Sequence, residues 1–111
     1  MSIKSNRPIA RTTMAAATDT TVANPGTSHR FMVNNLYCHD SDGGGATVNL
    51  YLSADAASTA GERIQQLVLA ANETKQFYPV AVAAGLYLIM QTAADNVNFH
   101  GSYTDYDGGD V

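Results

Sequence analysis

Residues 29–53 read HRFMVNNLYCHDSDGGGATVNLYLS, and they contain two strand patterns separated by a turn rich in aspartate and glycine. In the second pattern, residues 47–53, apolar Val48, Leu50 and Leu52 alternate with other residues, which is the period of two of a half-buried strand. Glycine supplies positive φ and aspartate supplies local hydrogen bonds in tight connections. The stretch therefore predicts two antiparallel strands joined by a loop.

The first pattern, residues 29–39, is long enough for a full strand, but both of its faces are mixed. Strict alternation places one set of side chains on one face, namely Phe31, Val33, Asn35, Tyr37 and His39. The other face then carries Met32, Asn34, Leu36 and Cys38. We therefore expect this strand to be covered on both sides at one end.

The chain after residue 17 continues as short strand patterns and turns. Further strand candidates are residues 18–24, 63–70, 75–80, 86–92 and 97–103. Pro79 places the 75–80 segment at a sheet edge or a strand end, because proline cannot donate to the ladder. About seven short strands and no long amphipathic helix predict an all-β fold over residues 17–111, a small antiparallel β-sandwich of jelly-roll or Ig-like type.

Residues 1–16 are polar, contain Pro8 and follow no period, so we expect an extended N-terminal arm. Residues 1–30 hold four basic residues against one acid, a balance of +3, whereas the other 81 residues have a balance of −7. A basic N-terminal segment on an otherwise acidic chain favours an arm that binds a protein partner. We expect Lys4, Arg7 and Arg11 to be its partner-binding residues, and removal of the arm to leave the fold intact.

The apolar content of 45% is misleading, because 17 of these residues are alanine and tryptophan is absent. A small domain with such light side chains buries a limited core, and such domains often depend on copies of themselves or on a partner. Self-association is therefore expected.

The sequence shows no run of about 18 apolar residues that would predict a membrane span. Its first residues lack the apolar segment of a secretory signal, and Cys38 is the sole cysteine. A single cysteine excludes an internal disulfide and fits synthesis in a reducing cytoplasm.

Signs of catalysis or of a cofactor are weak. A phosphate loop needs a helix after its glycines, but here a strand pattern follows. There is no Gly-x-Ser-x-Gly elbow and no acidic pair in an apolar setting. Three basic residues without interleaved aromatics would bind nucleic acid weakly at physiological salt. We expect no enzyme activity, no cofactor and no nucleic-acid partner.

A metal site is the alternative that the acidic turns leave open. Two Asp-x-Asp-Gly segments supply candidate ligands, which are His39, Asp40 and Asp42 in one and Asp105, Asp107 and Asp110 in the other. They could share one ion if the C-terminus folded back near the first turn. For zinc the candidates are Cys38, His29, His39 and His100, but Cys38 and His39 should point to opposite faces of a strand. We expect no metal.

The stretch TTVANPGTSHRFMVNNLYCHDSDGGGATVNLYLSAD, together with LVLAANETKQFY, resembles a pattern in small virion proteins of tailed bacteriophages. The shared features are a strand leading into a Pro-Gly turn, a long strand ending in a polar Cys-x-Asp stretch, and a Thr-Val-x-Leu-Tyr-Leu strand. The resemblance covers about residues 20–105. Here Asn-Pro-Gly-Thr stands where the pattern more often has Val-Pro-Ala-Gly.

This resemblance implies a structural virion protein, with capsid decoration (cement) as the first choice and a tail, head–tail or fibre role as the second. Decoration proteins of this type often form homotrimers on the major capsid protein and grip it with N-terminal arms. Tyr37, Tyr51, Tyr87 and Tyr103 could anchor contacts, since tyrosine joins an apolar body to a polar tip. A glycan-binding β-sandwich module is a further alternative, which the absence of tryptophan disfavours.

Overall fold

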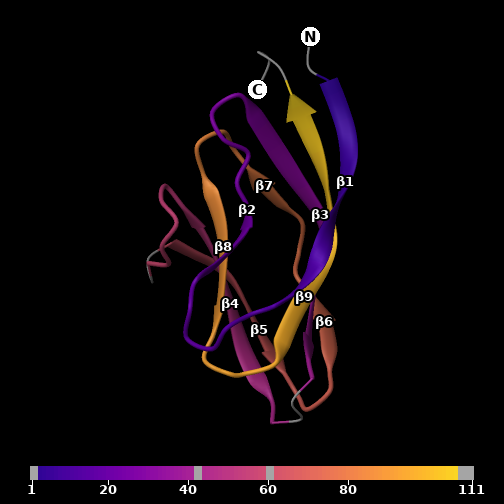
Figure 1. Cartoon of the computed structure of the whole chain (residues 1–111), viewed down its shortest axis with the longest axis vertical. Coiled ribbons are helices and arrows are strands. Elements are labelled where there is room, and N and C mark those ends of the chain that lie inside the picture. Colours follow the sequence, from indigo (N-terminus) through magenta and orange to yellow (C-terminus); the bar gives the residue numbers. More distant parts are fainter. Residues whose placement is uncertain (1–2, 42–43, 60–61, 108–111) are drawn as a thin grey trace.

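The computed structural model describes residues 3–41, 44–59 and 62–107. It consists of two antiparallel sheets packed face to face, which confirms the predicted all-β sandwich (Figure 1). The strands of the described residues are β1 Ile3–Thr13, β2 Thr20–Ala23, β3 His29–Asp40, β4 Ala46–Ser53, β5 Arg63–Leu69, β6 Thr74–Gln76, β7 Val80–Val82, β8 Tyr87–Thr92 and β9 Val97–Asp107. None of the described residues forms a helix that is long and apolar enough to cross a membrane.

The strand order identifies the sandwich as a jelly roll. One sheet, sheet A, has the order β1-β9-β3-β6, with β7 also paired to β3, and the other, sheet B, has the order β2-β8-β4-β5. The pairs β1·β9, β2·β8, β3·β6/β7 and β4·β5 thus alternate between the two sheets. A long antiparallel hairpin rolled around the core gives this order, whereas an Ig-like arrangement does not.

A bulge in β3 corrects the predicted faces of that strand. The pairing of β3 with β9 shifts between Val33 and Asn35. Asn34 and Asn35 therefore both bond to side chains of the outer face, with Asn34 donating to Thr104 Oγ1 (2.9 Å) and Asn35 donating to Ser102 Oγ (3.0 Å). On either side of the bulge the inward residues are apolar, Phe31 and Val33 before it and Leu36 and Cys38 after it. The mixed faces of the sequence pattern therefore arise from one inserted residue, which exchanges the inward and outward positions that follow it. They do not arise from burial of both faces of the strand, which the sequence pattern predicted.

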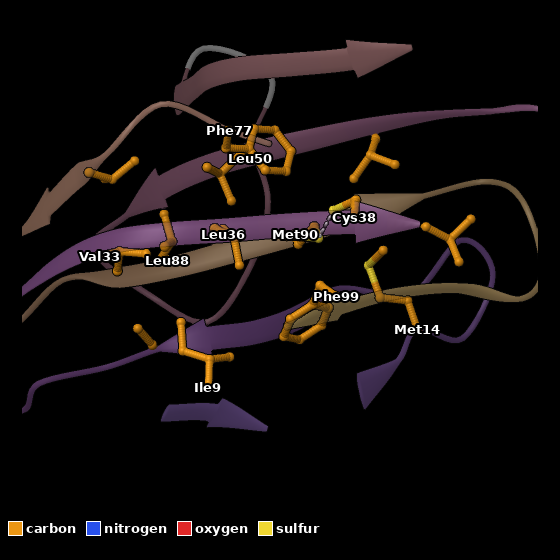
Figure 2. Packing of buried hydrophobic residues seen from close by; sticks show 14 of the residues in the cluster. Ile9, Met14, Val33, Leu36, Cys38, Leu50, Phe77, Leu88, Met90 and Phe99 are labelled. Atoms are coloured by element: carbon orange, nitrogen blue, oxygen red, sulfur yellow. Dashed lines mark hydrogen bonds between the residues drawn. The ribbon is translucent and has the colours of Figure 1, made fainter. Parts of the chain in front are cut away.

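The inner faces of both sheets form a single core (Figure 2). Its fully buried members include Val33, Leu36 and Val97 of sheet A, Val48, Leu50, Leu88 and Met90 of sheet B, and Phe77 between β6 and β7. The Cys38 thiol lies 3.4 Å from Met90 Sδ across the two sheets, as the dashed line in Figure 2 shows. The predicted inward face of residues 47–53 is confirmed, because Val48 and Leu50 are both fully buried.

The outer face of sheet B is also partly covered. Ile89 and Tyr51, which pair across β8 and β4 on this face, are buried although they do not belong to the core between the sheets. Asp19 accepts hydrogen bonds from Ser58 N (2.8 Å) and Ser58 Oγ (2.7 Å), and its carboxylate also binds Gln91 of β8. These bonds hold the segment after β4 against the sheet.

The N-terminal segment differs from the expected arm. Residues Ile3–Thr13 form β1, which pairs with β9 from Ile3↔Asp107 to Thr13↔Asn98 and is an edge strand of sheet A. Ile9 and Met14 are buried in the core. Figure 1 shows β1 running beside β9 along the length of sheet A. The segment is therefore part of the sandwich, because its apolar residues complete the core and its backbone completes the sheet.

Candidate functional site

The three basic residues predicted to bind a partner lie along β1, and they do not converge. Lys4 pairs opposite Tyr106 and Arg7 opposite Tyr103, so these two side chains point to opposite faces of sheet A. Arg11 lies seven positions beyond Lys4, roughly 24 Å along an extended strand. The only ion pair among these three within the described residues joins Arg7 Nε to Asp105 Oδ2 at 3.6 Å. Part of the basic charge therefore faces the chain's own acidic strand β9.

An ionic cluster lies where β3 begins and β9 ends. His29 Nδ1 is 2.8 Å from Asp105 Oδ1, and His29 Nε2 is 3.5 Å from Asp107 Oδ1. Asp105 is buried, whereas His29 remains about one third exposed. The hydrogen bond to Asp105 and the negative charges of both aspartates raise the pKa of His29 above its usual 6.5. The cluster thus favours the protonated imidazole.

The outer face of sheet A carries a polar hollow of about 260 Å³. We call it the histidine hollow, and its lining residues are Arg11, His39, Thr74, Asn98 and His100. They come from four neighbouring strands, β1, β3, β6 and β9. His39 Nδ1 lies 2.7 Å from Thr74 Oγ1, and the His100 ring stacks on Tyr37 with centroids 5.3 Å apart. Sequence inspection missed this grouping because its members are far apart along the chain.

A second groove, of about 180 Å³, lies near the start of β3. Its lining is mostly apolar and comes from β3, β7 and β9, with Phe31, Met32, Val82 and Tyr106 among the residues. The Arg30 guanidinium lies 4.8 Å from the centroid of the Tyr106 ring, a cation–π contact that borders the groove.

The strand register separates the described candidates for a shared metal site. Asp40 pairs opposite Val97 at one end of sheet A, while Asp105 pairs opposite Phe31 near the other end. The two positions are nine steps apart along β3, roughly 30 Å. Asp40 accepts the Gly45 N–H at 2.7 Å, and Gly45 has φ +80°, as the turn interpretation predicts. Asp42 and Asp110 lie outside the described residues.

Zinc ligation is not supported either. Within residues 3–41, 44–59 and 62–107, no three histidine, cysteine or acidic side chains gather as metal ligands. Cys38 is fully buried and points into the core, whereas His39 faces Thr74 outside, so the predicted opposite directions are confirmed. Burial raises the pKa of the Cys38 thiol to about 12. This thiol is therefore a packing group, neither a ligand nor a nucleophile.

The predicted tyrosine anchors are mostly engaged within the protein. Tyr51 is buried, Tyr103 packs on Phe31 with ring centroids 4.4 Å apart, and Tyr37 stacks on His100. Tyr87 is half-buried. The tyrosine that projects most is Tyr78, which is 81% exposed. Tyr78 lies between β6 and β7, next to Pro79, which interrupts the edge strand. Pro79 was the feature of the sequence that could have indicated this exposed position.

An apolar surface follows the edge strand β5. Ile64 and Val68 of β5 are 43% and 61% exposed, and Tyr78 lies beside the strand because Gln65 makes two hydrogen bonds to the Tyr78 backbone, at 2.8 and 3.1 Å. We call Ile64, Val68 and Tyr78 the β5 edge surface. These three are the large hydrophobic side chains that the described residues leave exposed. Because Ile64 and Val68 lie on the same edge strand and Gln65 holds Tyr78 beside it, this edge is a candidate protein contact.

Comparison with known proteins adds information on the fold. No family model matches the sequence, and no curated protein matches it. Among solved structures, the chain is similar to one described under the heading "Bacillus endospore appendages form a novel family of disulfide-linked pili". The TM-score is 0.59 with 17% sequence identity, and the match covers 98% of this chain and 92% of that chain. At this identity the likeness indicates a shared fold.

Proposed function

We propose that this chain is a structural virion protein that decorates a bacteriophage capsid and acts by associating with the major capsid protein and with copies of itself. The strand and turn motifs that resemble small virion proteins support the proposal. So does the jelly-roll order of the sheets, an architecture that is common in capsid proteins. We expect a homotrimer.

The observation that carries the proposal is the β5 edge surface. Ile64, Val68 and Tyr78 present apolar area on a strand that pairs only with β4 among the described strands. Burial of apolar area is worth about 25 cal/mol per Å². A surface of three side chains therefore gives weak attachment for one copy, and many copies on a regular lattice would add up to substantial stabilisation.

The opposite edge of the sandwich has the features of an edge that avoids association. Strand β1 is long, but it carries Lys4, Arg7, Pro8 and Arg11, and its pairing shifts between Ile9 and Thr12. Charged side chains, proline and bulges are the devices by which edge strands resist pairing with other chains. Strand β5 also begins with an exposed charge, Arg63, and its pairing with β4 shifts between Leu50 and Tyr51. It nevertheless presents the exposed apolar side chains of Ile64 and Val68, which favour β5 as the contact in place of the basic residues of the N-terminal segment.

The proposal is tested by binding to capsids that lack the protein. The wild-type chain should co-sediment with these shells, and Val68→Lys should reduce binding by about tenfold or more, because it places a charge in the apolar contact. Ala10→Lys, on the exposed face of β1, is the matched control and should bind normally. Equal binding of Val68→Lys and wild type would contradict the role of this edge.

The copy number distinguishes decoration from the tail role. Saturation at a number of copies comparable with the major capsid protein supports decoration. Saturation at a few copies per particle, or binding to tails alone, supports a tail, head–tail or fibre protein instead.

A second candidate is a subunit of a filamentous surface appendage. The likeness to the pilus structure, which extends over nearly the whole of both chains, favours it. The only cysteine of this sequence, Cys38, is fully buried, so the disulfide linkage named for that structure would have no accessible thiol in this fold. Electron microscopy of the purified chain separates the two: filaments that persist in reductant favour the appendage, and discrete oligomers favour decoration.

A further inference from the structure

We propose that the histidine hollow on the outer face of sheet A binds an oxyanion, meaning a phosphate or carboxylate group. This inference does not depend on the proposed virion role. It rests on the register that brings Arg11, His39 and His100 together.

A bulge places Arg11 beside His100. The pairing of β1 with β9 runs from Ile9↔Gly101 to Thr12↔Phe99, so two residues of β1, Ala10 and Arg11, lie opposite His100 alone. A bulge of this kind redirects side chains and is frequent next to binding sites. In this case it places Arg11 among the residues that line the hollow.

His39 of β3 and His100 of β9 are diagonal neighbours on adjacent strands. His100 pairs opposite Tyr37 and Asn98 opposite His39, so His39 and His100 are two positions apart on adjacent strands, roughly 7 Å between their backbones. The contact of His39 Nδ1 with Thr74 leaves Nε2 of that ring for a ligand. Stacking on Tyr37 fixes the plane of the His100 ring. The two rings are therefore held in place before any ligand arrives.

The charge of the hollow suits an anion. Among the residues that the structure describes, Arg11 makes no ion pair and no acidic side chain lines the hollow. This is unusual on a chain of net charge −4. The polar side chains of Thr74 and Asn98 supply further hydrogen-bonding groups at the same place. An arginine fork with two imidazoles recognises oxygen anions through charge-assisted hydrogen bonds.

The test is an NMR titration of the three histidine rings with inorganic phosphate and, separately, with acetate. It is done at about pH 6, where histidine side chains in general are partly protonated. Chloride holds the ionic strength constant. Saturable shifts of His39 and His100 are expected with at least one anion, and the tighter of the two identifies the class of ligand. His29, at the other end of sheet A, is the internal control and should not shift saturably.

Variants of β1 locate the site. Arg11→Gln should weaken binding about tenfold, the effect of losing one charge-assisted contact. Lys4→Gln removes the same charge from the same strand outside the hollow and should leave the affinity unchanged. Shifts that do not saturate with either anion would overturn the proposal, as would saturable binding that Arg11→Gln and Lys4→Gln affect equally.

Discussion

Gly101 lies in the middle of β9, where it allows the bulged part of β3 to approach closely. A Cβ built on Gly101 would lie 1.9 Å from the Asn35 carbonyl oxygen and 2.8 Å from its carbon. Both atoms belong to the backbone, so no side chain can move aside. The bulge at Asn34–Asn35 and the glycine opposite it therefore form a single structural unit.

Gly101→Ala should lower the free energy of unfolding by about 3 kcal/mol or more, at or above the upper end for overpacked sites. Urea denaturation measures this change. Ser102→Ala, one residue further along β9, is the matched control. It removes one hydrogen bond from Asn35 Nδ2 and should cost only about 1 kcal/mol. Equal losses in the two variants would contradict the close approach.

His29 makes the stability of the sandwich depend on pH. The folded pKa is raised, first by the hydrogen bond to Asp105, so the stabilisation is fully present below the unfolded pKa of 6.5. It is lost as the pH rises through the higher folded value. The difference in unfolding free energy between wild type and His29→Gln should therefore be larger at pH 5.5 than at pH 8. In an Asp105→Asn background this pH dependence should shrink, and a difference that grows with pH would refute the assignment.

At the level of elements, β1 determines whether residues 1–16 are dispensable. Deletion of residues 1–13 would expose the edge of β9 and remove buried Ile9 from the core. Loss of one buried side chain of this size alone costs about 2–5 kcal/mol. The deleted chain should be unfolded or aggregated, as seen by the loss of a cooperative thermal transition in circular dichroism.

The control for this deletion keeps the strand and removes its charge. Lys4→Gln combined with Arg11→Gln leaves β1 paired, and neither residue has an ion pair within the described residues. The double variant should melt within a few degrees of wild type, as expected for surface changes. If the chain without residues 1–13 melts at the wild-type temperature, the N-terminal segment is a separate arm and not a structural part of the sandwich.

These elements differ in how far the sequence predicts them. Residues 47–53 alternate because β4 is buried on its inner face, and the alternation alone predicts that strand. Strand β1 has no such pattern, since an edge strand tolerates proline and charge. The bulge at Asn34 and Asn35 depends on Gly101, far along the chain, so local periodicity cannot reveal it. The single strand predicted over residues 75–80 is instead two short strands, β6 and β7, separated by residues 77–79. Pro79 lies just before β7 at the edge of sheet A, as predicted.

Contact residues were harder to predict from the sequence than strands, because they too depend on the pairing of distant segments. Tyr51 and Tyr103 look like any surface tyrosine in sequence, and their burial depends on Ile89 and Phe31 from other strands. Tyr78 is exposed because it lies in the break between two short edge strands. The histidine hollow depends on the registers of four strands. Only the sheet pairing brings such residues together.

We propose that the whole molecule associates with other proteins through one apolar edge. The two edges of the sandwich differ, since β1 exposes charged side chains along its length, whereas β5 exposes Ile64 and Val68 beside Arg63. An exposed apolar surface of this kind is a candidate site of contact with another protein. We expect Ile64, Val68 and Tyr78 to lie inside that contact.

Light scattering of the purified chain over a range of concentrations measures this association. We expect a mass that is a multiple of 11.7 kDa for wild type and for Ala10→Lys, and a shift toward 11.7 kDa for Val68→Lys. A wild-type mass of 11.7 kDa at every concentration, or an oligomer that Val68→Lys leaves intact, would contradict it.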